Sequence, residues 1–308
     1  MSILTSLKSI LSPRHFDPYN KYYAIRKESF FQNDDYHQHF LRKGWVKISN
    51  VINEEEIQSF MGTFDYISTL EGFELDKNLL NSGRLFNPEI RKATLNVINQ
   101  NAPSVLSRIF DMSKIDTHTG GAYQVKPPHI NSDLLIHQDM SVIDEENDYC
   151  LFVWIPFCDV TKENGIISFV EGSHLWGNTQ RSLGVPWQFK PYIPTLYKNI
   201  VEVPVNKGDI LVFDPACIHA SSPNLSDKIR HAITMTVLRK NYQLVYYFRN
   251  PEIPENEIEK YYVDESFYYD YDFITKPDES IWRKEVHEYK NFDYSTFEFN
   301  RMVKAHQL

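Results

Sequence analysis

A series of short apolar segments between residues 120 and 239 constrains the fold of this chain most strongly. Four of them are DYCLFVWIPFCDV, NGIISFVEGSH, IVEVPVNKGDILVFDP and RHAITMTVLR, and they are rich in the β-branched and aromatic residues that favour strands. Turn sequences such as KENG and NKGD lie between them, as is typical of antiparallel strands. Many short strands without helical segments between them predict a β-sandwich or a jelly-roll barrel.

Helical patterns precede this strand-rich region. Residues 35–42 are predicted to form a helix, residues 45–48 a short strand, and the residues after Asn53 a second helix. Asn53 and Glu56 have the spacing of a capping box, in which each side chain bonds the backbone N–H of the other residue. The apolar residues that follow this cap recur at helical spacing: Ile57, Phe60, Met61, Phe64 and Ile67.

The 308 residues are expected to form a single domain in three parts. Residues 1–115 form a helical segment packed on the barrel, residues 116–242 form the barrel itself, and residues 243–308 form an aromatic, acidic extension. In the extension we expect one or two helices that pack against the barrel. A lid over a substrate pocket and a dimer contact are the alternatives for it.

The charge distribution argues against a nucleic-acid partner. The net charge is −9, and residues 251–308 carry 14 acidic and 7 basic residues, so most of the excess lies in the extension. No cluster of Lys and Arg follows one face of a predicted element, as binding to phosphates would require. The chain is therefore expected to act on a small molecule, and its oligomeric state is not predicted.

The sequence predicts neither a membrane span nor a secretory signal. The longest apolar runs, such as CLFVWIPF, are too short to cross a bilayer. The first residues, MSILTSLKSILSPRHF, lack a strong apolar core and a small-residue cleavage site. The three cysteines are scattered and odd in number, which suits a reducing compartment, so we expect a cytoplasmic protein.

The segment LLIHQDMSV, residues 134–142, contains a possible pair of metal ligands. His137 and Asp139 lie two residues apart, so on a strand both side chains would lie on the same face. Alone, this is as well explained by an ordinary polar pair at the end of a strand. His219 lies 82 residues after His137 and supplies a third ligand. Two imidazoles and one carboxylate form the facial triad that binds non-haem Fe(II) and leaves three positions open.

Arg230 adds a second requirement to this predicted site. It follows His219 by 11 residues and begins the predicted strand RHAITMTVLR. A guanidinium directed into a barrel without a partner would be very costly, so its position predicts an anion. A dicarboxylate cosubstrate would meet this need with a bidentate pair of hydrogen bonds.

Taken together, these features resemble the phytanoyl-CoA dioxygenase family of Fe(II)- and 2-oxoglutarate-dependent oxygenases. The resemblance rests on HQD, NGIISFVEGSH, KGDILVFDPACIHASSPN and Arg230, preceded by LRKGWVKISNVINEEEI, and covers roughly residues 36–240. Glu171 departs from the pattern, because the family usually has proline before GSH, and the residues after Tyr242 have no counterpart. The resemblance implies a mainly β fold with flanking helices, built as a double-stranded β-helix (a jelly-roll or cupin-like barrel).

The resemblance also implies roles for individual residues. The catalytic residues would be the three iron ligands, His137, Asp139 and His219. Arg230 would hold the distal carboxylate of 2-oxoglutarate, and the Ser221 hydroxyl would assist this contact. Gln124 resembles a strand residue that orients the cosubstrate, and Asn224 is a second candidate of the same kind. For both of these residues, the alternative is a hydrogen bond within the barrel wall or a turn.

The activity implied is hydroxylation of an unactivated C–H bond of a small metabolite, with Fe(II) as cofactor. 2-Oxoglutarate and O2 would be consumed, and succinate and CO2 released. Related halogenases lack the carboxylate that Asp139 supplies, so we expect hydroxylation rather than halogenation. Alternatives are desaturation, cyclisation or epimerisation at the same iron site, a non-catalytic metal-binding jelly roll, or a cupin-like hydrolase or isomerase with another divalent metal. Arg230 argues against the last of these.

Two segments, residues 81–92 and 174–197, are expected to shape the substrate pocket. The candidate substrate-binding residues are Arg84, His129, Trp176 and Arg181. The two arginines are of the type that binds a carboxylate or phosphate, although each is also typical of a solvated surface. Because the chain has no basic cluster for the phosphates of coenzyme A, we expect a small metabolite rather than an acyl-CoA.

Overall fold

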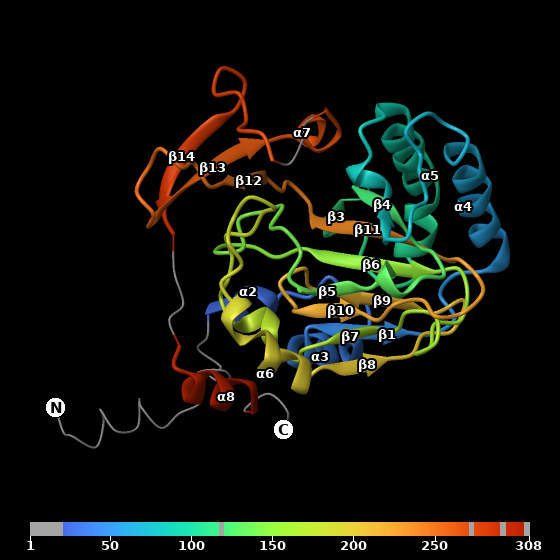
Figure 1. The fold of residues 1–308 in the computed structure, drawn as a ribbon, viewed down its shortest axis with the longest axis horizontal. Helices are drawn as coiled ribbons and strands as arrows, with labels where there is room; N and C mark the ends of the chain where they lie inside the picture. The colour runs from blue at the N-terminus through green and yellow to red at the C-terminus, as the bar shows by residue number, and fades with distance from the viewer. Residues whose placement is uncertain (1–20, 117–119, 271–273, 290–293, 305–308) are drawn as a thin grey trace.

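The computed structural model describes residues 21–116, 120–270, 274–289 and 294–304, and its centre is a barrel of two antiparallel sheets (Figure 1). Within these residues the larger sheet has seven strands: β1 (Trp45–Ile48), β9 (Ile210–Phe213), β6 (Leu151–Pro156), β11 (Arg230–Arg239), β4 (Gly121–Lys126) and β2 (Leu80–Asn81) in this order, and β3 (Ile115–Asp116), which pairs with β11. The smaller sheet has the order β5 (Leu134–His137), β10 (His219–Ser221), β7 (Ile167–Phe169) and β8 (Val201–Val203). Trp154, Phe169 and Phe213 belong to one buried cluster and pack the two sheets together.

The chain alternates between the two sheets as it builds the barrel. β4, β6, β9 and β11 lie in the larger sheet, whereas β5, β7, β8 and β10 lie in the smaller one. This alternation is the double-stranded β-helix, so the jelly-roll barrel with flanking helices that the sequence predicts is confirmed. The barrel brings β10 back beside β5, although 82 residues separate His137 from His219.

Helices of the N-terminal part cover the outer face of the larger sheet. α4 (Glu54–Ile67) and α5 (Pro88–Leu106) lie side by side over it and share one buried cluster with its strands (Figure 1). α3 (Asp34–Lys43) leads directly into β1. The other short elements of the first two-thirds are α2 (Lys21–Arg26), η1 (Ser82–Arg84), η2 (Ile130–Ser132), η3 (Ser173–Leu175), η4 (Lys190–Tyr192) and α6 (Ile193–Lys198).

The predicted capping box at the start of α4 is confirmed. The backbone N–H of Glu56 donates to Asn53 Oδ1 at 2.9 Å, and the N–H of Asn53 donates to Glu56 Oε2 at 3.0 Å. Glu56 also accepts a hydrogen bond from Arg108 Nη2 at 2.7 Å, which ties this helix to the residues after α5. The cap therefore fixes where the second helix begins relative to the barrel.

The C-terminal extension differs from the prediction of one or two packed helices. Its main element is a third antiparallel sheet of β12 (Leu244–Phe248), β13 (Glu257–Val263) and β14 (Arg283–Glu288). In the part of the extension that the structure describes, the helices are the short α7 (Glu265–Asp270) and α8 (Thr296–Lys304). Successive residues of β12 lie in different buried clusters: Tyr246 belongs to one and Val245 to the other. This is expected of a pleated strand, whose neighbouring side chains point to opposite faces. The dense repetition of tyrosine and acid obscured this period of two in the sequence.

The two helices of the extension lie in different places. α7 contacts α5, whereas α8 lies beside α6 and packs Phe299 and Met302 against Trp176 (Figure 1). The C-terminal sheet also contacts the preceding part of the chain, since Lys260 Nζ donates to Asp144 at 2.9 Å and Tyr289 Oη donates to the Pro186 carbonyl oxygen at 2.8 Å. Among the described residues, no helix is both long and apolar enough to cross a membrane.

Candidate active site

Two histidines and one aspartate meet where β5 pairs with β10. His137 ends β5, Asp139 follows it by two residues, and His219 begins β10 directly opposite His137. One ligand atom from each lies within 4.8 Å of the other two. Asp139 Oδ1 lies 3.4 Å from His137 Nε2, and Oδ2 lies 3.5 Å from His219 Nε2. These separations suit three neighbouring ligands of a single metal ion, each at about 2 Å from it.

The hydrogen bonds of the two histidines and the pKa shifts of His219 and Asp139 also suit a metal. His137 Nδ1 lies 2.8 Å from the carbonyl oxygen of Leu135, and His219 Nδ1 lies 2.9 Å from that of Cys217. Each Nδ1–H therefore donates to the backbone and leaves the Nε2 lone pair directed at the metal position. Burial, together with His137, lowers the pKa of His219 to about 4. Burial opposes ionisation of Asp139, but the two histidines outweigh it and lower its pKa to about 2.

At neutral pH the site thus presents the Asp139 carboxylate and a neutral His219 imidazole, and Nε2 of each histidine is directed at the metal position. This donor set, two imidazoles and a carboxylate on one face, fits ferrous iron and leaves room for three further ligands. His137 and Asp139 are about a quarter exposed, with 28% and 27% of their side chains accessible, and they face a cavity. The ion would be reached from that cavity.

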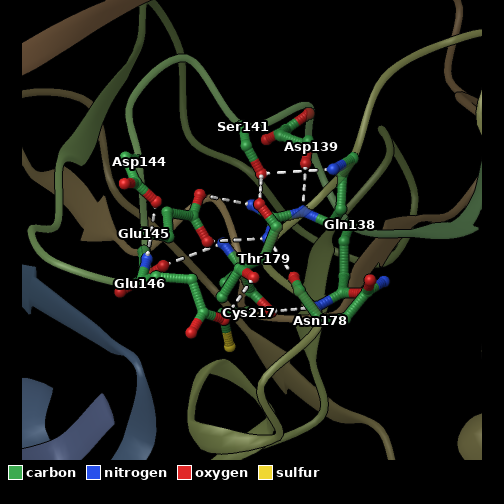
Figure 2. A network of polar contacts seen from close by, with 12 residues as sticks. Gln138, Asp139, Ser141, Asp144, Glu145, Glu146, Asn178, Thr179 and Cys217 are labelled. Carbon is green, nitrogen blue, oxygen red and sulfur yellow. Dashed lines mark hydrogen bonds and ion pairs between the residues drawn. The ribbon is translucent and has the colours of Figure 1, made fainter. Parts of the chain in front are cut away.

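A buried ion pair supports the backbone that carries Asp139, and its acidic member, Glu145, is labelled in Figure 2. Arg181 Nε donates to the Asp139 carbonyl oxygen at 2.6 Å, and its two Nη atoms each donate to a Glu145 carboxylate oxygen at 2.7 Å. Arg181 is 5% exposed and Glu145 is 1% exposed, so both charges are removed from water. Arg181, predicted to contact the substrate, is therefore occupied by Glu145 and holds the backbone of Asp139, a candidate metal ligand.

Gln138, between the candidate metal ligands His137 and Asp139, is held from the opposite side. Its Nε2 donates to the Ala216 carbonyl oxygen at 2.6 Å, and its Oε1 accepts from Asn178 Nδ2 at 2.8 Å (Figure 2). Trp187 Nε1 donates to the same Oε1 at 3.1 Å. The loop after η3 therefore holds residues 137–139, the ligand segment, by bonding both the Gln138 side chain and the Asp139 backbone.

A second group of polar residues lies inside the barrel, on the strands next to the metal ligands. Arg230 and Lys126 are register partners on β11 and β4, and they are 2% and 0% exposed. Arg230 Nη1 donates to the Gly165 carbonyl oxygen at 2.6 Å, and Lys126 Nζ donates to Ser221 Oγ at 2.6 Å. In the described part of the chain neither cation has an acidic partner within 4 Å, and Arg230 Nε is buried without a hydrogen-bond partner.

A buried guanidinium beside a buried lysine amine, with no acid within 4 Å of either among the described residues, makes this a strong site for an anion. Burial, reinforced by Arg230, lowers the pKa of Lys126 to about 6, and burial lowers the pKa of Arg230 to about 10. The Arg230 guanidinium also lies 5.3 Å from the centre of the Trp154 ring, a favourable cation–π contact. A carboxylate placed here would restore the charge balance that the protein itself leaves unmet.

The turn beside this anion site requires glycine. Gly165 has φ of +98°, and its carbonyl oxygen accepts hydrogen bonds from both Arg230 and Ser221. A Cβ added there would lie 2.6 Å from Lys126 Cδ and 3.0 Å from the Ser222 carbonyl oxygen. Only glycine therefore allows this backbone to approach the two cations so closely.

Of the residues predicted to assist the cosubstrate, Ser221 and Gln124 lie at the candidate site, whereas Asn224 does not. Ser221 lies between the two cations, because its hydroxyl contacts Lys126 at 2.6 Å and Arg230 at 3.4 Å. Gln124 lines the cavity in front of the metal ligands. Asn224, in contrast, uses its side-chain amide for the carbonyl oxygens of Lys126 and Lys228 at 2.9 and 2.7 Å, the turn bond that was its alternative.

Lys126 is the residue of this group that is not predicted from the sequence. It ends the apolar segment GGAYQVK, where a lysine commonly reaches solvent. Its partnership with Arg230 depends on the register of β4 and β11, which the sequence pattern does not provide. The feature of the sequence that could have indicated a role for Lys126 is the presence of a lysine at the end of a predicted core strand.

A cavity of about 700 Å³ opens in front of His137 and Asp139. Arg84, predicted to bind substrate, lines it, and so does Arg91, which was not predicted. His129 and Trp176 are not among the lining residues: His129 Nδ1 accepts a hydrogen bond from the Asn131 N–H, and Trp176 is 3% exposed. Of the four substrate candidates, the cavity thus brings Arg84 and the engaged Arg181 to the metal site.

Comparison with known families and relatives gives one family match. The family described as Phytanoyl-CoA dioxygenase (PhyH) matches residues 40–232. "Phytanoyl-CoA dioxygenase 1" of Oryza sativa subsp. japonica is 32% identical over 119 residues, which cover 38% of this chain and 42% of the relative. The match therefore spans less than half the length of the rice protein. "Phytanoyl-CoA dioxygenase domain-containing protein 1 homolog" of Caenorhabditis briggsae is 27% identical over 261 residues, covering 67% of this chain and 91% of the relative.

Solved structures of similar shape are more distant in sequence. The epimerase SnoN in complex with Fe3+, alpha ketoglutarate and nogalamycin RO has a TM-score of 0.49 at 18% identity, with 71% of this chain and 87% of that chain covered. The non-heme alpha ketoglutarate dependent carbocyclase SnoK from nogalamycin biosynthesis has a TM-score of 0.48 at 21% identity, with 71% and 88% covered.

Proposed function

The chain belongs to the phytanoyl-CoA dioxygenase (PhyH) family, and we propose that it is an Fe(II)- and 2-oxoglutarate-dependent dioxygenase. It hydroxylates an unactivated C–H bond of a small metabolite and releases succinate and CO2. One observation carries the proposal: a complete set of two imidazoles and one carboxylate lies beside two buried basic side chains, Arg230 and Lys126, that have no acidic partner within 4 Å among the described residues.

Different protein residues would bind the metal and the cosubstrate. His137, Asp139 and His219 would hold the ion on one face and leave three coordination positions for 2-oxoglutarate and O2. Bound ferrous iron supplies the activation of O2 at the expense of 2-oxoglutarate. The protein contributes orientation, a site shielded from bulk water and fixed charges.

The cosubstrate would be recognised at its far end by the cations inside the barrel. Arg230 and Lys126 would bind the distal carboxylate, and Ser221 Oγ, which accepts a hydrogen bond from each of them, would hold the two side chains in place. Gln124 lines the cavity and would orient the molecule from β4. Trp154 would cover the guanidinium and exclude water from the contact.

The experiment that tests the activity is turnover of 2-oxoglutarate. Protein supplied with Fe(II), 2-oxoglutarate and O2 should release succinate, and a true substrate should increase the rate. The Asp139→Ala variant is the control, because it keeps the barrel but removes the carboxylate ligand. Equal succinate from both proteins would overturn the proposal. Mass spectrometry of the product separates outcomes, since hydroxylation adds one oxygen atom and desaturation removes two hydrogen atoms.

Binding of 2-oxoglutarate is expected to weaken as pH rises above about 6. In the free protein burial keeps Lys126 mostly neutral above its pKa of about 6, whereas a bound carboxylate favours the ammonium form. Binding therefore takes up a proton, and affinity falls by up to about tenfold per pH unit until the pKa of the complex is reached. Titration of anaerobic Fe(II)-loaded protein with 2-oxoglutarate, from about pH 6 to about pH 9, measures this slope.

The Lys126→Met variant is the control for that slope. It keeps the length of the side chain but cannot titrate, so its dissociation constant should be higher at low pH and change less with pH. Other groups titrate equally in both proteins, so the difference between the two curves isolates Lys126. Parallel curves would show that Lys126 does not charge on binding.

We also propose a cytoplasmic location and a small-molecule partner. Cys150, Cys158 and Cys217 are all free thiols, which supports a reducing compartment. The cavity in front of the metal ligands, about 700 Å³, is of the size that holds a small organic molecule.

A further inference from the structure

We propose that Arg84 and Arg91 form an anion subsite in the substrate cavity, and that the substrate is an organic anion with an apolar body. This inference rests on the proposed function, because it takes the cavity in front of the iron ligands as the substrate pocket. The anionic group is a carboxylate or a phosphate ester. It is separate from the cosubstrate site, because Arg230 and Lys126 are not among the lining residues of this cavity.

Both arginines line the cavity and neither is neutralised. Among the described residues, no acidic group lies within 4 Å of either guanidinium. Arg91 Nη2 donates to the Phe86 carbonyl oxygen at 3.1 Å, but its Nε is buried without a hydrogen-bond partner. A buried N–H of a charged group that lacks an acceptor is costly, so a ligand oxygen would be favoured there.

The two arginines are held by the barrel and are not carried on a free loop. Arg84 ends η1, which contacts α5, and Arg91 lies in the first turns of α5, which begins at Pro88. Just before η1, Asn81 of β2 pairs in register with Gln124 of β4, a barrel strand that also faces the cavity. The positive end of the α5 dipole adds to the attraction for an anion at this wall.

Two of the three acidic groups in the same cavity are engaged. Asp139 is a candidate iron ligand, whereas Asp133 lines the cavity without a basic partner within 4 Å among the described residues. Glu265 of α7 accepts a hydrogen bond from the Tyr242 hydroxyl at 2.6 Å. The third cavity arginine, Arg181, is neutralised by Glu145. The positive charge of Arg84 and Arg91 is therefore local to the wall formed by η1 and α5, where neither arginine has an acidic partner within 4 Å among the described residues.

The rest of the wall suits an apolar body. Aliphatic side chains reach the cavity from α5, from the loops and from the strands: Leu95, Val142, Leu183, Val185, Leu238 and Leu244. Burial of such a body supplies affinity, and the arginine pair supplies orientation. A molecule anchored by its anion at α5 would extend its apolar part toward His137 and Asp139.

The test compares probes that differ only in their head group. Full-length protein, anaerobic and saturated with Fe(II) and 2-oxoglutarate, is titrated with octanoate, octyl phosphate, octanol and octylamine by calorimetry. Quenching of Trp187, which lines the cavity, gives a second readout that does not depend on turnover. Saturating 2-oxoglutarate keeps the probes away from Arg230. We expect octanoate or octyl phosphate to bind at least about tenfold more tightly than octanol and octylamine.

Three variants make the result specific. The double variant Arg84→Gln/Arg91→Gln should bind the anionic probe no better than octanol. The single variant Arg84→Gln, at an exposed position, should lose part of the preference and guards against misfolding of the double variant. Lys92→Gln removes the same charge one residue away, at an exposed position that does not line the cavity, and should bind the probe as wild type does.

The outcomes separate this inference from the proposed function. If octanoate and octyl phosphate bind no better than octanol, or if the double variant keeps the preference while 2-oxoglutarate still binds, the anion subsite is overturned. If wild-type protein does not bind 2-oxoglutarate, the proposed function fails instead. A preference for octyl phosphate over octanoate identifies a phosphate ester, and the reverse identifies a carboxylate.

Discussion

Replacing Arg230 with methionine is expected to weaken the binding of 2-oxoglutarate by about a hundredfold while iron still binds. The guanidinium is 2% exposed, and loss of one partner of a buried, hydrogen-bonded charge pair costs about 3 kcal/mol, which corresponds to this factor. Methionine fills a similar volume, and Lys126 remains to supply part of the attraction. Anaerobic titration of the Fe(II)-loaded variant with 2-oxoglutarate measures the change in dissociation constant.

The matched control for this prediction is Arg239→Met on the same strand. Arg239 lies at the other end of β11, where it contacts Asp148 at 3.0 Å and Glu28 at 2.7 Å on the surface. It should bind 2-oxoglutarate as wild type does. A dissociation constant for Arg230→Met within about threefold of wild type would place the distal carboxylate elsewhere.

Replacing Arg181 with methionine should have the largest effect on stability and should also disturb the metal site. The substitution leaves the Glu145 carboxyl buried without its partner, a loss of about 3–5 kcal/mol when such a pair is broken. Burial raises the pKa of Glu145, so the variant would keep this carboxyl protonated, and the loss should lie near the lower end. Denaturant unfolding of the metal-free protein measures the free energy of unfolding.

A double variant and a metal titration complete this test. Arg181→Met/Glu145→Met replaces both charges by apolar groups and should be more stable than Arg181→Met alone by at least about 1 kcal/mol. Iron affinity should fall about 10- to 100-fold in the single variant, because the Asp139 carbonyl loses its 2.6 Å hydrogen bond. If Arg181→Met is as stable as wild type and binds iron equally well, the pair does not support the ligand segment.

The sequence predicts the barrel well, because the residue composition that favours strands and turns is a local property of each segment. Segments such as DYCLFVWIPFCDV contain β-branched and aromatic residues that only a buried strand accommodates, and turns such as NKGD fix where strands end. The capping box of Asn53 and Glu56 is local too, and the structure has it as predicted. The C-terminal sheet was not predicted, since its tyrosine and acid pattern fits a helix as easily as a strand.

The candidate site depends on contacts between segments that are distant in the sequence, and fewer of these contacts could be predicted. The structure brings His137, Asp139 and His219 together as predicted, and their roles as iron ligands remain proposals. Lys126 could not be predicted, because its place beside Arg230 depends on strand register. The role of Arg181 depends on a carboxylate 36 residues away, so no local pattern distinguishes it from Arg84, which has no such partner.

The most direct test of the central claim is the visible charge-transfer band of iron with bound 2-oxoglutarate. Fe(II) and then 2-oxoglutarate are added to the metal-free protein without oxygen, and metal content is measured on the same samples. We predict a band in wild type, its loss in Asp139→Ala, and its recovery in Arg230→Met only at much higher 2-oxoglutarate concentration. Iron bound by the wild-type protein with no band at saturating 2-oxoglutarate would contradict the account.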